Sequence, residues 1–265
     1  MKKAIAALTL AASVASMGAF AKDWKEIRIG VEGAYPPFSE TKPDGSIVGF
    51  DIDIAMALCE EMKAKCTLVK QDWDGMIPAL QAKKFDAIIA SMSINEERKQ
   101  KVDFSKKYYN TPQRLVAKNN TKIKDAKPEH LKDVKIGVQR GTIADQFVSK
   151  FWEPKGAKVV RYAKQDEVYM DLKAGRVDAS FQDSVEASEG FLKKPEGKDF
   201  KFVGEPMFGK TPEEKAVLGE GAGVAVRKED KDLRDAFNKA IDSIRKSGKY
   251  GKINGKYFKF DVYGG

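Results

Sequence analysis

The chain has 265 residues, of which 48 are Lys or Arg and 39 are Asp or Glu, so its formal net charge at pH 7 is +9. One histidine and two cysteines are too few for most metal centres, and no basic stripe interleaved with aromatic residues indicates a nucleic-acid partner. We therefore predict no metal, no other cofactor and no nucleic acid. The length suits two modest domains or one large domain.

The N-terminus has the features of a secretory signal peptide in the expected order. Lys2 and Lys3 precede an apolar run at 4–17 that is short for a membrane span, and Ala-Phe-Ala at 19–21 fits the cleavage rule. A short buried helix is the alternative, but it explains fewer of these features. We predict that residues 1–21 are removed. No cysteine stands at the cleavage site to take a lipid anchor, which favours the periplasm of a Gram-negative cell.

A strand–helix–strand plan follows the signal peptide. "RIGV" at 28–31 is a strand pattern, and "FDIDIAMALCEEM" at 50–62 has apolar residues at helical spacings of three and four. A second helix is expected to end near Ala82, and a short buried strand to begin at Asp86. A charged helical stretch comes next, with Arg98 in its first turn. Strands that alternate with helices favour a parallel α/β sheet.

The two cysteines, Cys59 and Cys66, are close together in the sequence. In an oxidising compartment this favours one disulfide that closes a small loop. Metal ligation is the alternative, but it is less favoured because the spacing is not CxxC and the chain has a single histidine.

The second half of the chain repeats the same plan. "KIGV" at 135–138 repeats "RIGV", and "LKAGRVDASFQD" from Leu172 repeats "LQAKKFDAIIAS" from Leu80. Two matches in the same order make chance the weaker explanation, so we predict two lobes. A strand and a long amphipathic helix at 222–253 have no counterpart after the first copy and could complete the first lobe.

The predicted fold is therefore α/β and two-lobed, with a mostly parallel sheet flanked by helices in each lobe. We expect a discontinuous first lobe of residues 22–110 plus 218–265, and a second lobe of residues 111–217. Two short connections between rigid lobes would form a hinge.

Polar and aromatic residues follow the predicted strands at their carboxyl ends, where open α/β sheets bind ligands. Each of them alone is more often a surface residue or a helix cap, but the duplication directs the whole set toward one cleft. They are Glu32, Ser91 and Ser93 in the first lobe, Gln139, Thr142 and Asp183 in the second, and Tyr35 and Trp73 in loops of the first.

The charges of this set suit an amino acid. The guanidinium of Arg98 fits a carboxylate, and the free N–H groups of the helical stretch after Thr142 also favour an anion. Asp183 and the serine oxygens would accept hydrogen bonds from an ammonium group. Glu32 is then a further acid for a cationic side chain, which the two aromatic rings could flank. Two acids against one arginine leave a net negative site that a cationic ligand would balance.

Six stretches of the sequence have a recognisable pattern: "IRIGVEGAYPPFS" (27–39), "GFDIDIAMALCEEMKAKC" (49–66), "WDGMIPALQAKKFDAII" (73–89), "SMSINEERKQKVDFS" (91–105), "QDSVEASEGFLK" (182–193) and "KYFKFDVYG" (256–264). With them the chain resembles the periplasmic amino-acid-binding proteins of ABC importers, a branch of the family 3 solute-binding proteins that binds lysine, arginine, ornithine or histidine. The resemblance implies the type II periplasmic binding protein fold, a monomer, a membrane permease as partner, and no catalysis.

The resemblance also implies a role for each residue. The ligand α-carboxylate would be bound by Arg98 and by the backbone N–H groups of Ser93, Thr142 and Ile143. The α-ammonium would be bound by Asp183, the Ser91 carbonyl and the Ser93 hydroxyl. Tyr35 and Trp73 would flank the side chain, Glu32 would meet its cationic end, and Asp51 would support the site from its rim. The cysteines match the disulfide of the branch.

Several positions depart from the pattern of the branch. Ala90 stands where a serine is common, and Glu32 and Trp73 stand where an aspartate and a phenylalanine are common. Gln139, Ile143 and Ala144 change the pocket for the side chain. "IGVQR" and "EERK" favour arginine or ornithine over histidine. The expected preference is arginine, then ornithine and lysine.

Two other classes of function share this pattern. A dehydratase-like enzyme of the same fold would need a general acid in the cleft, and each of the three candidate acids already has a binding role. A sensory or adhesin-like exported protein would use the same site and differ only in its partner.

Overall fold

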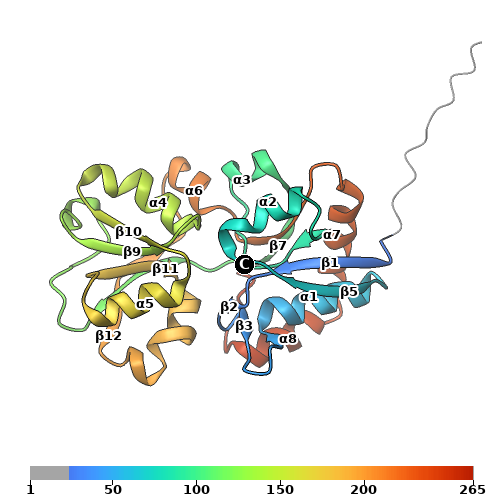
Figure 1. Ribbon diagram of the computed structural model, residues 1–265, viewed down its shortest axis with the longest axis horizontal. Coiled ribbons are helices and arrows are strands. Elements are labelled where there is room, and N and C mark those ends of the chain that lie inside the picture. Colours follow the sequence, from blue (N-terminus) through green and yellow to red (C-terminus); the bar gives the residue numbers. More distant parts are fainter. Residues whose placement is uncertain (1–23, 265) are drawn as a thin grey trace, which may run out of the picture.

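The computed structural model describes residues 24–264, so the predicted signal peptide at 1–21 lies outside the described residues. Two lobes lie side by side along the longest axis of the molecule (Figure 1). Each lobe is built on a five-stranded sheet with helices on both faces. The two-lobed α/β fold predicted from the sequence is thus confirmed.

The first lobe contains the sheet with strand order β5-β1-β6-β13-β7 and a small three-stranded sheet, β2-β3-β4. Its strands are β1 (Glu26–Val31), β2 (Ala34–Tyr35), β3 (Ser39–Thr41), β4 (Ile47–Val48), β5 (Lys65–Lys70), β6 (Ala87–Ile88), β7 (Asp103–Tyr109) and β13 (Ala222–Val226). Its helices are α1 (Phe50–Glu61), α2 (Met76–Gln81), α3 (Glu96–Lys101), α7 (Lys231–Lys246) and α8 (Lys249–Tyr257).

The second lobe contains the sheet with strand order β10-β9-β11-β8-β12. Its strands are β8 (Gln113–Lys118), β9 (Lys135–Gln139), β10 (Lys158–Tyr162), β11 (Ala179–Asp183) and β12 (Phe200–Met207). Its helices are α4 (Ile143–Phe151), α5 (Gln165–Ala174) and α6 (Pro212–Leu218). A π-helix spans Glu186–Leu192, and short 3-10 turns are Trp73–Gly75, Pro128–His130, Glu153–Lys155 and Pro195–Gly197.

Both sheets are mixed in the same way. In the first, β1 pairs in parallel with β5 and β6, while β13 pairs antiparallel with β6 and β7. In the second, β9 pairs in parallel with β10 and β11, while β8 pairs antiparallel with β11 and β12. The parallel pairs come from the repeated strand–helix–strand plan. The antiparallel pairs belong to the strands next to the passages of the chain between the sheets.

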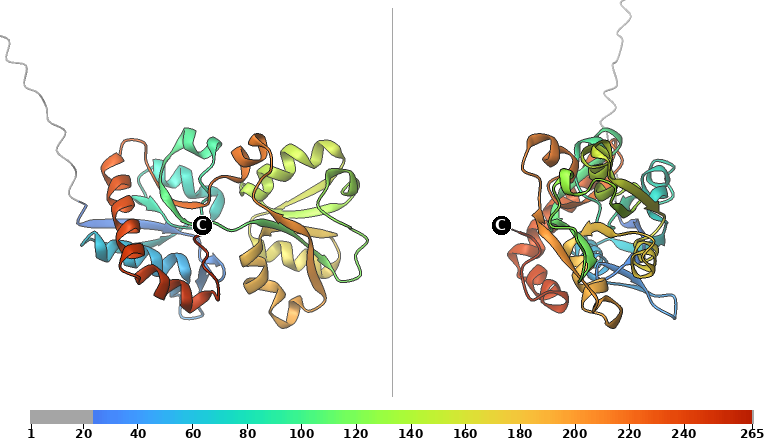
Figure 2. Two further views of the ribbon diagram at one scale, coloured as in Figure 1. Left: turned by 180° about the vertical axis from the view of Figure 1, so that it is seen from behind. Right: turned by 90° about the vertical axis from the view of Figure 1, so that its left-hand side faces the viewer.

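The chain passes between the two sheets twice. It leaves the first sheet after β7 and enters the second with β8, through residues 110–112. It returns after α6 through residues 219–221 and adds β13 to the first sheet. The C-terminal segment lies beside the first of these connections, since the Asn110 amide donates to the Val262 carbonyl at 2.8 Å. Figures 1 and 2 show this end of the chain between the lobes.

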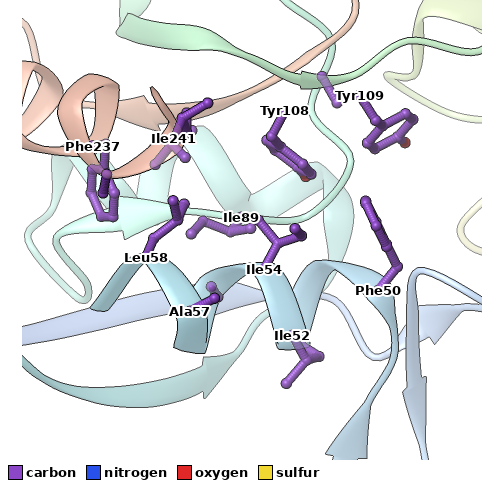
Figure 3. Packing of buried hydrophobic residues seen from close by; sticks show 14 of the residues in the cluster. Phe50, Ile52, Ile54, Ala57, Leu58, Ile89, Tyr108, Tyr109, Phe237 and Ile241 are labelled. Atoms are coloured by element: carbon purple, nitrogen blue, oxygen red, sulfur yellow. The ribbon is translucent and has the colours of Figure 1, made fainter. Parts of the chain in front are cut away.

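The core of the first lobe explains why α1 is helical. Phe50, Ile54 and Leu58 recur at intervals of four, which places them on one face, and all three are fully buried. This face packs against β7 and against Phe237 and Ile241 of α7, as Figure 3 shows. Each such side chain stabilises the fold by about 1.5–3 kcal/mol when removed from water. Packing of this face therefore fixes α1.

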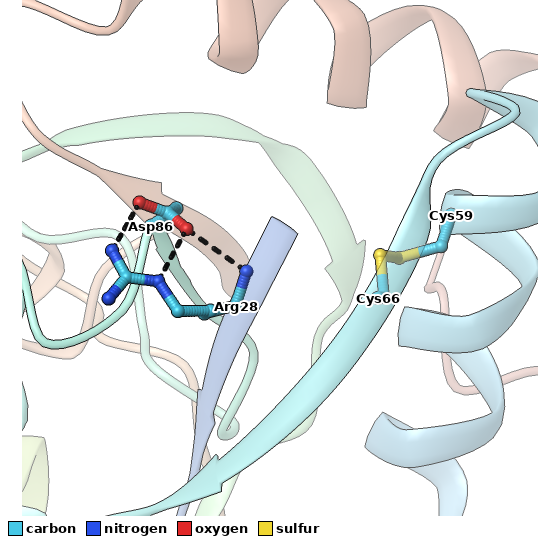
Figure 4. Close-up of a disulfide and its surroundings, with 4 residues drawn as sticks. All are labelled: Arg28, Cys59, Cys66 and Asp86. Carbon is cyan, nitrogen blue, oxygen red and sulfur yellow. Dashed lines mark hydrogen bonds and ion pairs between the residues drawn. A yellow bond between two sulfur atoms is a disulfide. The ribbon is translucent and has the colours of Figure 1, made fainter. Parts of the chain in front are cut away.

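Cys59 and Cys66 form a disulfide that joins the last turn of α1 to β5, with their Cα atoms 6.2 Å apart (Figure 4). The pairing predicted from the sequence is confirmed, and the metal-ligand alternative is wrong for these two residues because each sulfur is bonded to the other.

An ion-pair network fixes the start of β6. Arg28 on β1 donates through Nε and Nη2 to the two oxygens of Asp86, at 3.1 and 3.0 Å, and its backbone N–H also donates to Asp86 (Figure 4). The buried Arg227, just after β13, donates to the same carboxylate at 3.3 Å. Burial alone would raise the pKa of Asp86, but the hydrogen bonds and charge of Arg28 outweigh it and lower the pKa. The network ties three neighbouring strands together at the end of the sheet opposite the cleft.

None of the helices between residues 24 and 264 combines the length and the apolar character that crossing a bilayer requires.

Candidate functional site

A cleft of about 630 Å³, including the part open to solvent, lies between the lobes. Eleven of the twelve residues predicted to surround the ligand line it: Glu32, Tyr35, Trp73, Ala90, Ser91, Ser93, Arg98, Gln139, Thr142, Ile143 and Asp183. The twelfth, Asp51, lies behind the wall of the cleft. The structure thus brings the predicted residues together, while their contacts with a ligand stay a prediction.

The strand ends explain this convergence. Glu32 directly follows β1, and Ala90 and Ser91 follow β6 by two and three residues in the same sheet. Gln139 and Asp183 are the last residues of β9 and β11 in the second sheet. These strands point their carboxyl ends toward the other lobe, so residues far apart in the sequence share one cleft.

Arg98 is buried at the first-lobe wall, with 4% of its surface exposed. Its Nη1 donates to the Ser93 carbonyl at 3.0 Å and its Nη2 donates across the cleft to the Gly141 carbonyl at 3.1 Å. Burial lowers the pKa of Arg98 to about 10, which leaves the guanidinium charged at neutral pH. A guanidinium has five N–H groups, so donors remain for a carboxylate.

Asn95 is the residue that caps α3 and so positions Arg98. The sequence had offered Ser91 and Ser93 as possible helix caps, and neither has that role. The Asn95 side chain accepts the backbone N–H of Arg98 at 3.0 Å and so caps the N-terminus of α3. Ser91 and Ser93 are thereby free of a capping role and line the cleft.

The N-terminus of α4 faces Arg98 from the second lobe. Gly141 has φ 73, a left-handed conformation that glycine adopts without strain, and the next residue, Thr142, caps α4 by accepting the Asp145 N–H at 3.2 Å. The N–H groups in the first turn of a helix have no acceptor within the helix, and its dipole favours an anion there. Arg98 and the start of α4 therefore form one anion-binding corner.

Asp183 also lines the cleft, at the end of β11. Its carboxylate accepts the backbone N–H groups of Val185 and Glu186, at 2.8 and 3.1 Å, and the hydroxyl of Thr111. Burial raises the pKa of Asp183 to about 6, against the lowering effect of these three hydrogen bonds. Asp183 is therefore largely ionised at neutral pH and is held in one orientation.

Asp51 supports the cleft from behind Ser91. It is fully buried and accepts the Ser91 hydroxyl at 2.9 Å and the Tyr108 hydroxyl at 3.0 Å, while the Ser91 N–H donates to the same Tyr108 oxygen. Burial raises the pKa of Asp51 to about 7. Ser91 has φ 55, a conformation that costs energy for a residue other than glycine. The hydrogen bonds of Ser91 to Asp51 and Tyr108 offset this strain and fix the residue at the cleft.

Glu32 and Gln139 meet across the cleft. Gln139 Nε2 donates to Glu32 Oε1 at 2.6 Å, and Glu32 keeps only 5% of its surface exposed. Burial raises the pKa of Glu32 to about 7, although the Gln139 hydrogen bond acts to lower it. A cation close to Glu32 would favour its ionised form.

The two aromatic residues have different neighbours. Tyr35 stacks on Phe38 with ring centres 6.0 Å apart. The Trp73 ring lies 5.2 Å from the Arg98 guanidinium, so part of this ring already contacts a cation of the protein. Both rings still line the cleft.

Sequence reasoning missed Thr111 and Tyr108, which orient Asp183 and Asp51. The signal for Thr111 was its place in a predicted connection between the lobes, directly beside the cleft. Tyr108 gives no signal, because an aromatic residue in a strand is typical of any core. Ala144, which the sequence placed in the pocket for the side chain, also lines the cleft, and the further lining residues are Tyr109, Asn110, Gln113, Gln165, Gln182, Leu218, Gly221 and Ala222.

No group of three or more His, Cys, Asp or Glu residues within 24–264 is arranged to hold a metal ion. The acids of the cleft are separated and each accepts hydrogen bonds from its own donors. An anion-binding corner and two acids in one cleft suit a ligand with one carboxylate and more than one cationic group.

Comparison with known proteins agrees with this geometry. A family model described as bacterial extracellular solute-binding proteins, family 3, matches residues 27–260. The chain is 52% identical to an L-arginine-binding protein of Pseudomonas aeruginosa, over 100% of this chain and 99% of the other. It is 46% identical to a histidine-binding periplasmic protein of Escherichia coli, with 100% of both chains covered.

A solved structure has the same architecture. An ancestral arginine-binding protein bound to arginine superposes with a TM-score of 0.80 and 38% sequence identity, over 88% of this chain and 98% of the other. The family resemblance predicted from the sequence is confirmed. The chain belongs to the bacterial extracellular solute-binding proteins of family 3.

Proposed function

We propose that this protein binds a cationic L-amino acid between its lobes in the periplasm and delivers it to the permease of an ABC importer. The proposed preference is arginine, then ornithine and lysine. The observation that supports this most is the charge content of the cleft, which holds Arg98 and the α4 N-terminus together with the acids Asp183 and Glu32. The relatives that bind arginine or histidine by name agree with it.

At the shared end of the ligand, Arg98 and the N–H groups of Ser93, Thr142 and Ile143 bind the α-carboxylate. Asp183 binds the α-ammonium together with the Ser91 carbonyl and the Ser93 hydroxyl. A hydrogen bond to a charged group contributes about 1.5–3 kcal/mol. Several of them in a cleft that excludes water would account for recognition of any α-amino acid.

At the variable end, Glu32 binds the guanidinium or ammonium group of the side chain. Tyr35 and Trp73 flank the methylene chain, and a planar guanidinium can stack on a ring while it donates to Glu32. Arginine therefore uses more of this pocket than lysine or ornithine does.

Residues 22–110 plus 218–265 and residues 111–217 act as two rigid lobes that close over the ligand about the two connections. The closed form is the one that the permease recognises. Residues 1–21 direct export and are then cleaved off, and the protein acts as a monomer without catalysis, since each acid in the cleft serves to bind or support the ligand. The absence of catalysis is tested by incubating the protein with an amino acid that it binds and following that amino acid by chromatography. No turnover is expected.

The decisive experiment is calorimetric titration of refolded, ligand-stripped protein with the twenty amino acids, ornithine and citrulline. Arginine should bind most tightly. Citrulline is the matched control, because it has nearly the shape of arginine without the charge. If citrulline binds as tightly as arginine, the proposal that the site selects a cationic ligand is wrong.

A further inference from the structure

A glutamine outside the ligand cleft joins the two lobes. Gln146 lies in α4 of the second lobe, and its Oε1 accepts Asn95 Nδ2 at 2.7 Å while its Nε2 donates to Glu97 at 2.9 Å. Both partners belong to the N-terminus of α3 in the first lobe. Gln146 and Asn95 line a surface groove between α3, α4 and α6, and neither residue lines the ligand cleft.

Asn95 connects this contact to the anion-binding corner. Its Oδ1 caps α3 by accepting the Arg98 N–H, while its Nδ2 donates to Gln146 and to the Val217 carbonyl of α6. Asn95 is 2% exposed, so its amide is fully used within the protein. The residue that orients Arg98 thus bonds directly to the second lobe.

The two helices joined in this way are the ones that meet the carboxylate in the proposed function. Arg98 is in the first turn of α3, and Thr142 caps α4 one turn before Gln146. We infer that Gln146 is a positioning residue that sets the affinity for every amino-acid ligand without touching any of them, by holding α3 and α4 in the alignment that binds the α-carboxylate; this rests on the proposed function.

Other contacts between the lobes differ from this one. The Arg140–Asp74 ion pair, at 3.1 Å, has half-exposed side chains, and ion pairs of that kind contribute little. The Gln139–Glu32 hydrogen bond lies inside the cleft, so changes there also alter the pocket for the ligand side chain. Only contacts outside the cleft can change affinity without changing the order of preference.

The test is the Gln146→Ala variant, titrated calorimetrically with arginine, lysine and histidine. Because closure would lose two hydrogen bonds of ordinary net strength, the Kd should rise about 5- to 150-fold, by the same factor for each ligand. The matched control is Gln100→Ala, which removes an exposed glutamine from the same groove and no bond between the lobes. Its Kd should stay within about twofold of wild type.

A second variant guards against an effect on folding. Gln146→Glu replaces the donor to Glu97 by a carboxylate, so it should weaken binding at least as much as Gln146→Ala. Adding Glu97→Gln should recover most of that loss, since a donor then faces the new carboxylate. A folding defect would not be rescued in this way.

Two results overturn the inference: a Kd for Gln146→Ala within twofold of wild type, or a change of more than twofold in the ratio of Kd values between ligands. The effect concerns the carboxylate end that all amino acids share, so the titrations use whichever amino acids the wild type binds. A wild type that prefers a neutral amino acid contradicts the proposed ligand and leaves this test in force. A wild type that binds none contradicts both.

Discussion

The pH dependence of arginine binding should come mainly from Glu32. Its carboxyl is buried, and this burial raises its pKa to about 7. In the proposed function arginine requires the ionised carboxylate, so binding below that pKa must first remove a proton. A group whose pKa lies two units above the solution pH costs roughly 2.7 kcal/mol to ionise. The affinity for arginine should therefore fall roughly 100-fold between about pH 9 and pH 5 through Glu32 alone.

Glu32→Gln separates this effect from the rest of the site. The variant keeps the size of the side chain and loses its charge, so arginine should lose the contact of a buried charge pair, worth about 2–5 kcal/mol, or roughly 30-fold and upward. In the proposed function Asp183 binds every ligand, so its pKa of about 6 should leave a weaker dependence of roughly tenfold at pH 5 in the variant.

Calorimetry in buffers of different ionisation enthalpy measures the protons directly. Wild type should release about half a proton per arginine near pH 7, where Glu32 is half protonated, and Glu32→Gln should release far fewer. Citrulline should show the small proton release of the variant even with the wild-type protein. Equal arginine affinity in wild type and variant, within threefold, would refute the role of Glu32. So would identical pH profiles.

Three further outcomes can be measured. Arg98→Ala should weaken binding of every amino acid by about 2–5 kcal/mol in calorimetry. A folded variant whose Kd is within threefold of wild type would show that Arg98 lines the cleft without binding the ligand. Alkylation and mass spectrometry of natively exported protein should find no free thiol at Cys59 or Cys66; replacing both with alanine should lower the unfolding free energy in urea by about 2–4 kcal/mol and leave the arginine Kd unchanged. Because the pKa of Asp86 is lowered in the folded state, the stabilisation it gives is present above the unfolded pKa and is lost as the pH falls below about 4. Asp86→Asn should therefore reduce the change of the unfolding free energy with pH in that range, as measured by urea unfolding. An unchanged pH dependence would contradict the role of Arg28.

The sequence allowed the cleft to be predicted because its residues follow strand ends. Internal repetition located β1, β6, β9 and β11, and the residues after a parallel strand lie at a common edge whatever the details of packing. Arg98 could be predicted from its place in the first turn of a charged helix. None of these inferences required knowledge of a contact between side chains.

The rest depends on side chains that meet only in three dimensions. Thr111 with Asp183, and Gln139 with Glu32, join residues far apart in the sequence, and no local pattern indicates such pairs. The left-handed conformation of Ser91 likewise depends on Tyr108, which periodicity marks only as a strand residue. The antiparallel placement of β13 could not be predicted either, because alternation shows that a strand is buried without showing its partners.

The strand order of the first sheet also bears on how the chain folds as it is made. β13 lies between β6 and β7, so this sheet is incomplete until residues near 226 have emerged. All five strands of the second sheet come from one continuous stretch, between residues 113 and 207. Domains usually form from the N-terminus onward during synthesis. Here the middle of the chain can finish first, while the N-terminal strands wait for a partner from the C-terminal fifth, so the lobe that begins the chain is the last to be completed.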